Sequence, residues 1–329
     1  MRITTTTKHA LKRLLLGPHD YPQQFPLGLC EPQSEVSVWL HGIRSPRDVT
    51  YQHFMLCGAP LTVGIDVDDS DSMASGENAR PVLQFRSRPG NSILLGEMLL
   101  RFSRTINIGT RRLMLFHVIG HRNYCMPKAR LLARYLFYAY QRLKTPVAGV
   151  SITAHEIHAM MVLYICPRPI VLVSVVDGAV GNIFPMNLMG PVGNQHYAFA
   201  LNTNTPVGTL VDKAGAVALS SIPFEQTALA FQLGKNHRKT SINWMELPFS
   251  TKPSNYWGLP VPTFSTRVRE MSLESSYQLG SHTLFIARII TDERLRDGAE
   301  CFVVHGIYQA WRSKRSCGTH NLTEKVTIS

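Results

Sequence analysis

The residues best placed to do chemistry lie in one short segment of the C-terminal half, between Leu201 and Leu210. Thr205 is a favourable helix N-cap and Pro206 suits a first helical position, so a helix is expected from Pro206 until Gly215 ends it. The start of such a helix offers free backbone N–H groups and the positive end of a dipole, which suits a phosphate group. Taken alone, these residues favour the simpler interpretation of an ordinary capped helix.

Two other polar segments have part of a metal-site pattern but lack residues that the pattern requires. His155, Glu156 and His158 do not form the HExxH pattern of zinc sites, so capping or surface roles are expected for them. The acidic segment 66–77 lacks a glycine at the position where a calcium loop requires one, which favours a solvated loop. The chain has no GxGxxG after a strand, no Walker A segment and no GxSxG elbow. We therefore predict no metal site and no Rossmann dinucleotide site.

The elements that must position these residues are predicted from local patterns. Residues 170–176 are apolar and β-branched, Asp177-Gly178 is a type I′ hairpin signal, and residues 179–186 return as the partner strand. Further strands are expected at Tyr197–Leu201, Ala216–Ser220 and Leu284–Thr291. Short antiparallel strands of this kind favour a closed or nearly closed sheet.

The N-terminal half mixes strands and helices. Strand-like runs cover Val36–Leu40, Leu61–Ile65 and Leu113–Val118. Residues 128–144 have the spacing of an amphipathic packing helix, although a basic helix on a membrane surface is an alternative. Its apolar face is expected to contain Leu131, Leu132, Tyr135, Leu136, Ala139 and Leu143. A capping box at Thr153 and Glu156 predicts a second helix that ends near Ile165.

Composition indicates a folded protein of 329 residues, long enough for two domains, with 44% apolar and 17% charged residues. A net charge of +12 attracts polyanions, but no helix-turn-helix, RNP-like or zinc-finger pattern is present, so no nucleic-acid partner is expected. The six cysteines form no CxxC pair, which favours reduced thiols and a cytoplasmic location.

No export signal or integral membrane association is expected. The N-terminal leucine run is short and no small-residue cleavage site follows it. The apolar stretch 160–176 approaches the length of a membrane span, but Pro167-Arg168-Pro169 interrupts it. A helix end, a turn and a buried strand fit this stretch better.

The segment Pro167–Asn187 and the run Gly280-Ser281-His282-Thr283 together resemble the flavin reductase-like family, which has an FMN-binding split β-barrel. The resemblance covers roughly residues 160–312. It implies an α+β chain with an N-terminal α+β domain of unknown role at 1–150, the split-barrel domain at 151–315, and a tail at 316–329.

The resemblance also implies a set of flavin-binding residues. The loop before the expected helix would hold the FMN phosphate through Asn202, Thr203, Asn204 and Thr205. The segment 234–239 resembles a basic family segment, which would bring Lys235 and Lys239 to the phosphate. The isoalloxazine ring would lie along Asn182, Pro185, Met186 and Asn187.

Departures from the family pattern affect two of these places. The phosphate loop has no arginine or lysine, so charge must come from elsewhere. Asn187 and Leu188 stand where serine and tryptophan are commoner, so the edge of the flavin would be held differently.

The same resemblance implies a flavin-dependent oxidoreductase. Ser281 would bind the flavin, and His282 would lie beside it as the catalytic residue, orienting the nicotinamide or supplying positive charge. Hydride would pass from NADH or NADPH to FMN, then to oxygen, a partner monooxygenase or an organic acceptor. A homodimer is expected. The alternatives are a non-catalytic flavin-binding or interaction module, and a basic protein associated with membranes or polyanions.

Overall fold

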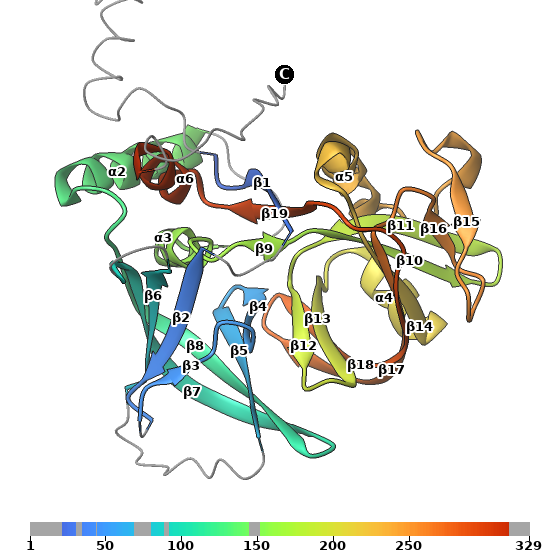
Figure 1. Cartoon of the computed structure of the whole chain (residues 1–329), viewed down its shortest axis with the longest axis horizontal. Helices are drawn as coiled ribbons and strands as arrows, with labels where there is room; N and C mark the ends of the chain where they lie inside the picture. Colours follow the sequence, from blue (N-terminus) through green and yellow to red (C-terminus); the bar gives the residue numbers. More distant parts are fainter. Residues whose placement is uncertain are drawn as a thin grey trace, which may run out of the picture.

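The computed structural model describes residues 22–30, 35–43, 45–68, 80–88, 92–144 and 152–315. Strands predominate over helices in this part of the chain, and two large sheets lie side by side (Figure 1). The expected mixture of strands and helices is confirmed in this coarse form. The tail at 316–329, the N-terminal leucine run and most of the acidic segment 66–77 lie outside the described residues.

The C-terminal sheet has seven antiparallel strands in the spatial order β11-β10-β14-β17-β18-β13-β12. Its strands are β10 (Val171–Asp177), β11 (Val180–Met186), β12 (Met189–Val192), β13 (His196–Asn202), β14 (Ala216–Ser221), β17 (Arg267–Leu279) and β18 (His282–Arg294). The predicted hairpin is confirmed, with Gly178 at φ 57° in the turn between β10 and β11. All three further strands are also found.

Short helices connect these strands. The predicted helix is α4 (Pro206–Ala214), and Gly215 ends it in the left-handed conformation at φ 64°. The chain between β14 and β17 contains η1 (Phe224–Gln226), α5 (Thr227–Gln232), η2 (Leu233–Arg238), η3 (Trp244–Glu246), β15 (Thr251–Pro253) and β16 (Pro260–Pro262).

The N-terminal sheet also has seven antiparallel strands, in the order β3-β2-β6-β7-β8-β5-β4. Its strands are β2 (Val36–His41), β3 (Arg47–Asp48), β4 (His53–Gly58), β5 (Leu61–Asp68), β6 (Val82–Ser87), β7 (Leu94–Ile108) and β8 (Arg111–Asn123). If the strands are numbered from one within each sheet, both sheets have the order 2-1-5-6-7-4-3. The two halves therefore share one topology, which the sequence did not predict.

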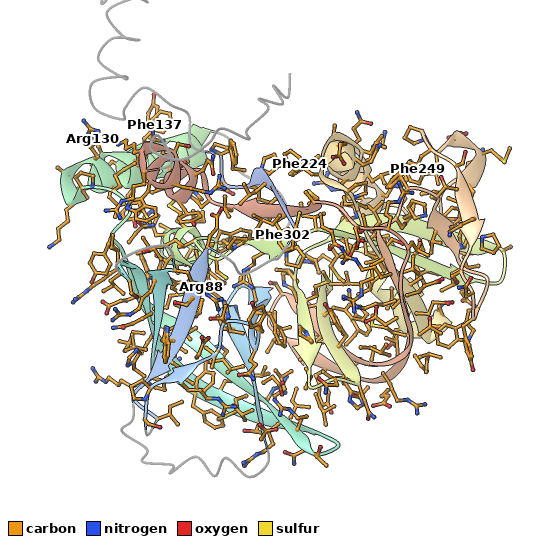
Figure 2. The ribbon with its side chains drawn as sticks, in the orientation of Figure 1. Arg88, Arg130, Phe137, Phe224, Phe249 and Phe302 are labelled. Carbon is orange, nitrogen blue, oxygen red and sulfur yellow. The ribbon has the colours of Figure 1, made fainter. Side chains whose placement is uncertain are left out.

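A third, three-stranded sheet joins the two halves. It pairs β1 (Phe25–Leu29), β19 (Glu300–Val304) and β9 (Arg168–Pro169), and it leads into α6 (Gly306–Arg315). Phe302 of β19 is buried in an apolar core that includes Val38 of the N-terminal sheet and Ile183 of the C-terminal sheet. Figure 2 shows Phe224 and Phe302 at this junction. The core is thus continuous across both halves.

Two helices complete the N-terminal half, one on the sheet and one outside it. Both α2 (Lys128–Lys144) and α3 (Ala154–Leu163) match the predicted segments, and the capping box of Thr153 and Glu156 is present. The predicted apolar face of α2 was partly wrong, because Leu132 and Leu136 are 59% and 65% exposed. Among the side chains of α2 that the structure describes, a narrow stripe that includes Leu131 packs on Met161 and Ile307, because α2 lies at the edge of the molecule; Leu143 lies outside the described side chains.

Candidate functional site

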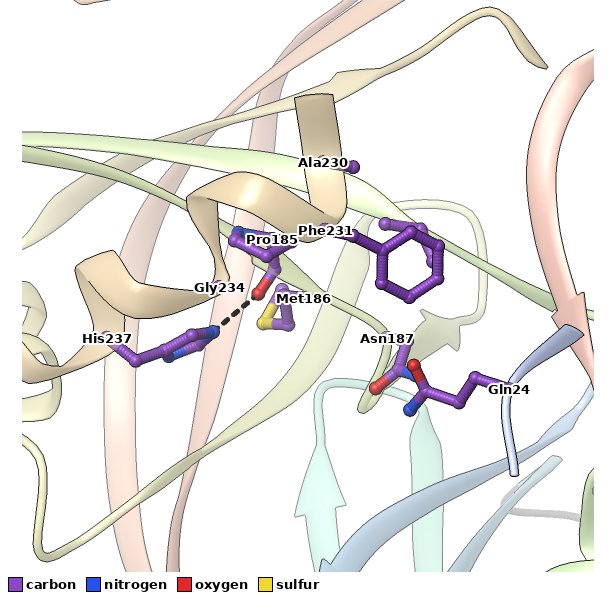
Figure 3. Close-up of a pocket in the computed structure, with 9 residues that line it drawn as sticks. Gln24, Pro185, Met186, Asn187, Ala230, Phe231, Gly234 and His237 are labelled. Atoms are coloured by element: carbon purple, nitrogen blue, oxygen red, sulfur yellow. Dashed lines mark hydrogen bonds between the residues drawn. The ribbon is translucent and has the colours of Figure 1, made fainter. Parts of the chain in front are cut away.

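A cavity of about 210 Å³ lies at the end of β11, between that strand and the helical segment α5–η2 (Figure 3). Three of the residues expected along the isoalloxazine ring line it together, namely Pro185, Met186 and Asn187. The rest of the lining consists of Gln24, Ile170, Ala230, Phe231, Gly234 and His237. The structure thus gathers three residues of one predicted group around a partly open space with both polar and apolar walls.

His237 fixes one wall of this cavity. Its Nε2 atom donates a hydrogen bond to the carbonyl oxygen of Pro185 at 2.7 Å, which the close-up shows as a dashed line (Figure 3). Burial lowers the pKa of His237, so the ring is neutral near pH 7. The bond holds η2 against the end of β11.

Asn182 holds the same two elements together from inside the protein. It is fully buried, and its amide nitrogen donates to the carbonyl oxygens of Asn236 at 3.1 Å and Lys239 at 2.7 Å. The Asn236 amide returns a bond of 2.9 Å to Ile183 O. Asn182 is not among the residues that line the cavity; it positions the segment that forms the cavity's wall.

Asn187 connects the cavity with the second predicted group of residues. Its amide nitrogen donates to the Tyr164 hydroxyl at 3.2 Å. The next residue, Leu188, accepts a bond of 2.9 Å from the backbone nitrogen of Ala200 in β13. The end of β11 therefore lies beside the last residues of β13, from which the predicted phosphate loop begins.

The phosphate loop is held by bonds within its own chain. Asn202 Oδ1 accepts from the backbone nitrogen of Asn204 at 2.8 Å, and Asn202 O accepts from the Thr205 hydroxyl at 2.7 Å. Thr205 occupies the N-cap position, but its side chain makes no capping bond to α4. The prediction of Thr205 as the N-cap residue is thus confirmed, although its hydroxyl bonds back to the turn and does not cap the helix.

Ser281 and His282 lie directly beside this loop. Asn202 and His282 are paired in register across β13 and β18, and Thr203 donates to the carbonyl oxygen of Ser281 through both N and Oγ1, each at 3.1 Å. His282 Nδ1 lies 2.9 Å from Ser281 Oγ and 3.5 Å from Cys57 Sγ. The predicted phosphate loop and the predicted pair Ser281 and His282 are thus contiguous in space.

The electrostatics of His282 narrow its possible role. Its side chain is 9% exposed, and burial lowers its pKa to about 4. The imidazole is therefore neutral at physiological pH. Of the two roles expected for it, hydrogen bonding agrees with this state and supply of positive charge does not.

Lys235 and Lys239 are exposed and do not line the cavity. Lys235 belongs to η2, and Lys239 follows η2 directly. Because η2 contacts both β11 and α4, these two cations lie on the segment between the cavity and the helix that follows the phosphate loop. Neither lysine is shown to reach the loop.

Sequence reasoning missed some residues of this region. Cys57 comes from the N-terminal sheet and belongs to no recognisable sequence motif. His237 lies inside the basic segment 234–239, in which only Lys235 and Lys239 were predicted to bind, because of their charge. Gln24 and Tyr164 had no signal, because their place depends on the three-stranded sheet and on the end of α3.

Three further findings concern the described residues alone. No group of three or more histidine, cysteine or acidic side chains there has an arrangement suited to a metal ion. No helix among them is long and apolar enough to cross a membrane. Cys30, Cys57, Cys125, Cys166 and Cys301 are free thiols.

Comparison with known proteins gives structural matches only. No family model and no curated protein matches this chain. Among solved structures, the chain is similar to the NADH:FAD oxidoreductase SgcE6 of Streptomyces globisporus C-1027, at 15% identity and a TM-score of 0.42, over 49% of this chain and 95% of that one.

Two further similarities are of the same kind. An FMN-binding protein from Thermus thermophilus is 18% identical over 42% of this chain and 86% of that one, with a TM-score of 0.37. The styrene monooxygenase flavin reductase (SMOB) of Pseudomonas putida S12 is 17% identical over 41% of this chain and 87% of that one, with a TM-score of 0.35. The resemblance to flavin reductases and FMN-binding split-barrel proteins, first seen in the sequence, is thus found among solved structures, at low identity and over part of the chain.

Proposed function

We propose that the protein is a flavin-dependent oxidoreductase that moves hydride from NADH or NADPH to FMN. The observation that carries this proposal is the cavity at the end of β11, where Pro185, Met186 and Asn187 come together with His237. Its volume of about 210 Å³ is below the roughly 300–1,000 Å³ of pockets that enclose a whole ligand. It therefore suits the ring system of FMN, with the phosphate outside.

The residues of the cavity fit an isoalloxazine ring chemically. Met186, Phe231 and Ile170 provide apolar walls that exclude water, and the amides of Asn187 and Gln24 provide hydrogen-bonding groups at one edge. Bound FMN would supply the hydride-accepting centre, which amino-acid side chains lack. The protein's part is binding, orientation and exclusion of water.

The phosphate of FMN would lie at the loop 202–205. The N-terminal N–H groups of α4 have no capping side chain, and the Asn and Thr side chains nearby are neutral donors. Lys235 and Lys239 would supply the balancing charge from η2. Ser281, beside this loop, would bind the flavin, and neutral His282 would orient the nicotinamide by hydrogen bonding.

The reduced flavin would pass its electrons to oxygen, to a partner monooxygenase or to an organic acceptor. A second candidate function is a non-catalytic flavin-binding module. The absence of any arginine or lysine from residues 202–205 favours it, because a neutral loop holds a dianion less firmly.

The proposal is tested by titrating the protein with FMN and with riboflavin, followed by flavin fluorescence. We expect saturable binding of FMN and binding of riboflavin that is weaker by at least about tenfold, the equivalent of about 1.4 kcal/mol. Lys235→Gln and Lys239→Gln should weaken the binding of FMN but not that of riboflavin. Lys252→Gln on β15 serves as the matched control. Equal affinity for both flavins in every variant would remove the phosphate site from the proposal.

A further inference from the structure

The two large sheets repeat one plan in finer detail than their strand order. In each sheet the two longest strands form a hairpin with a two-residue loop, Gly109-Thr110 in one and Gly280-Ser281 in the other. Both glycines have φ 56°. Arg111 is the first residue of β8 and His282 is the first residue of β18, so the two residues occupy equivalent positions in the two sheets.

The phosphate loop has an equivalent place in the N-terminal sheet. Asn202 faces His282 across β13 and β18, and Asp68 faces Arg111 across β5 and β8. Asp68 is therefore the equivalent of Asn202. Each position is the last residue of its strand.

The two sheets also contact each other reciprocally. The tip of the β4–β5 hairpin docks on the loop at Gly280, where the Ser281 N–H donates to Ala59 O at 2.9 Å. The tip of the β12–β13 hairpin docks beside β5 and the start of β8 in the other sheet, where the Gly193 N–H donates to Asp66 Oδ2 at 2.9 Å and Gly193 lies against Arg111. The same hairpin of each half thus reaches the equivalent residues His282 and Arg111 of the other half, although the individual hydrogen bonds differ.

One buried apolar cluster fills the space between the sheets. Three pairs of equivalent residues take part in it, namely Ile108 with Leu279, Leu113 with Leu284, and Leu115 with Ile286. Each of these side chains is at most 5% exposed. The face that each sheet offers is covered by the other sheet of the same chain.

The two equivalent places differ in charge. Around Asn202 and His282 the side chains are neutral. At the other place, Arg111 binds Asp66 through Nε at 2.9 Å and Nη2 at 2.6 Å, and it also pairs with Asp68. Its guanidinium is thus engaged by two carboxylates, and Asp68 also pairs with Arg47 at 3.8 Å, so the charges at this place are matched within the chain and Arg111 is not available to a phosphate.

We infer that the chain is an internal pair of like-folded halves that binds one flavin: the N-terminal half covers the flavin site as a second subunit would, and its own equivalent site is closed by Arg111, Asp66 and Asp68. This inference rests on the proposed function. It gives the N-terminal half a role, since its β4–β5 hairpin brings Cys57 and Ala59 to Ser281 and His282.

The inference is tested by measuring how many FMN molecules the full chain binds, by equilibrium dialysis, with the molar mass from light scattering on the same sample. We expect one FMN per chain. Two FMN per chain would overturn the inference and leave the proposed function standing. Absence of any FMN binding would overturn both.

A matched pair of variants separates the two places. Asn202→Asp keeps the oxygen that accepts from Asn204 but adds the charge found at Asp68, and we expect FMN affinity to fall at least about tenfold with riboflavin affinity unchanged. Asp68→Asn removes the equivalent charge and should leave FMN affinity and stoichiometry unchanged. Weaker FMN binding in Asp68→Asn than in Asn202→Asp would place the flavin in the N-terminal half and contradict the inference.

Discussion

At the scale of single residues, His282 has an environment that permits only a neutral imidazole. Its Nδ1 atom faces Ser281 Oγ and Cys57 Sγ, both uncharged partners, and no carboxylate contacts it among the described residues. With its pKa lowered to about 4 by burial, the ring does not change charge between pH 5.5 and 8. A role in orienting the nicotinamide is therefore independent of pH in that range.

Replacing His282 with glutamine is expected to slow FMN reduction by NADH about tenfold, about 1.4 kcal/mol of barrier, with a change in FMN affinity of less than about twofold. The measurement is stopped-flow absorbance between pH 5.5 and 8, with His196→Gln as the control. The wild-type rate should show no inflection from His282. An inflection near pH 6.5 that the glutamine variant lacks would mean that His282 titrates as an exposed histidine.

The sequence identified this residue only through its surroundings. A lone histidine before a strand has no chemical signature, and Gly280-Ser281-His282 gained meaning from a family resemblance. Cys57 could not be found in this way, because its contact with His282 joins residues 225 positions apart. Such pairs follow from how the two sheets dock.

At the scale of elements, the cavity depends on how η2 is held against β11. Asn182 and Asn236 exchange bonds between the two elements, and His237 adds a third bond to Pro185 O. All of these bonds are accepted by backbone carbonyl oxygens. They fix η2 against β11 and do not use the side chains that would contact a ligand in the cavity. Asn182 was predicted to bind the flavin, and the structure gives it a positioning contact.

Asn182→Ala should leave the Lys239 carbonyl oxygen without the Asn182 donor, while Asn236 O keeps its bond from the Lys239 N–H, and should lower the free energy of unfolding by about 1–3 kcal/mol. FMN affinity should fall as well, because the wall of the cavity loosens. Urea unfolding and FMN titration measure the two effects, with the exposed Asn255→Ala as the control. A loss of affinity with no loss of stability would indicate that Asn182 touches the flavin directly.

A second element-scale prediction concerns the contact between the sheets. A Cβ atom at Gly190 in β12 would overlap the ring of Phe54 in β4, so Gly190→Ala should destabilise the protein by about 1–3 kcal/mol. Gly208→Ala in α4, where the added carbon meets atoms no closer than 3.9 Å, is the control. Thermal unfolding compares them. Equal stability of the two variants would contradict the close packing of β4 on β12.

The helices and hairpins were predictable because their signals are local. The capping box at Thr153, the Asp177-Gly178 turn and the Pro206 helix start each require only neighbouring residues, and each was found. The buried face of α2 was partly missed, because the spacing of Leu132 and Leu136 does not say how much of a helix its neighbours cover. The shared topology of the two sheets was missed for a related reason, since strand order is a non-local property.

At the scale of the whole molecule, the two halves are tied by three connections: the bridging sheet, the continuous core and the exchange of hairpin tips. We therefore expect the described halves to unfold together. The expectation of a homodimer stays a prediction. The internal pairing supplies a physical reason why the proposed flavin site would need no second chain.

Buried histidines make this stability sensitive to acid. Burial lowers the pKa of His53 to about 3, of His282 to about 4 and of His305 to about 3. Once unfolded, each histidine binds a proton below about pH 6.5, while the folded form does not until its lowered pKa. The stabilisation is therefore complete above pH 6.5 and is lost as pH falls toward 4.

Each of these three histidines should lower the free energy of unfolding by about 1.4 kcal/mol for each unit that the pH falls between pH 6 and 4.5. Together they lower the free energy of unfolding by about 4 kcal/mol per unit, which is large beside a typical 5–15 kcal/mol. Urea unfolding at pH 7, 6 and 5 measures the slope. A free energy that stays constant over this range would contradict the burial of these rings in the folded state.

The central claim is that the cavity at the end of β11 holds a flavin that accepts hydride from a nicotinamide. It is tested most directly by the anaerobic visible spectrum of the protein with FMN, before and after NADH and then NADPH are added. The account predicts a perturbed flavin spectrum that bleaches much faster than free FMN with at least one donor. A spectrum identical to that of free FMN, with bleaching at the rate of free FMN, would contradict it.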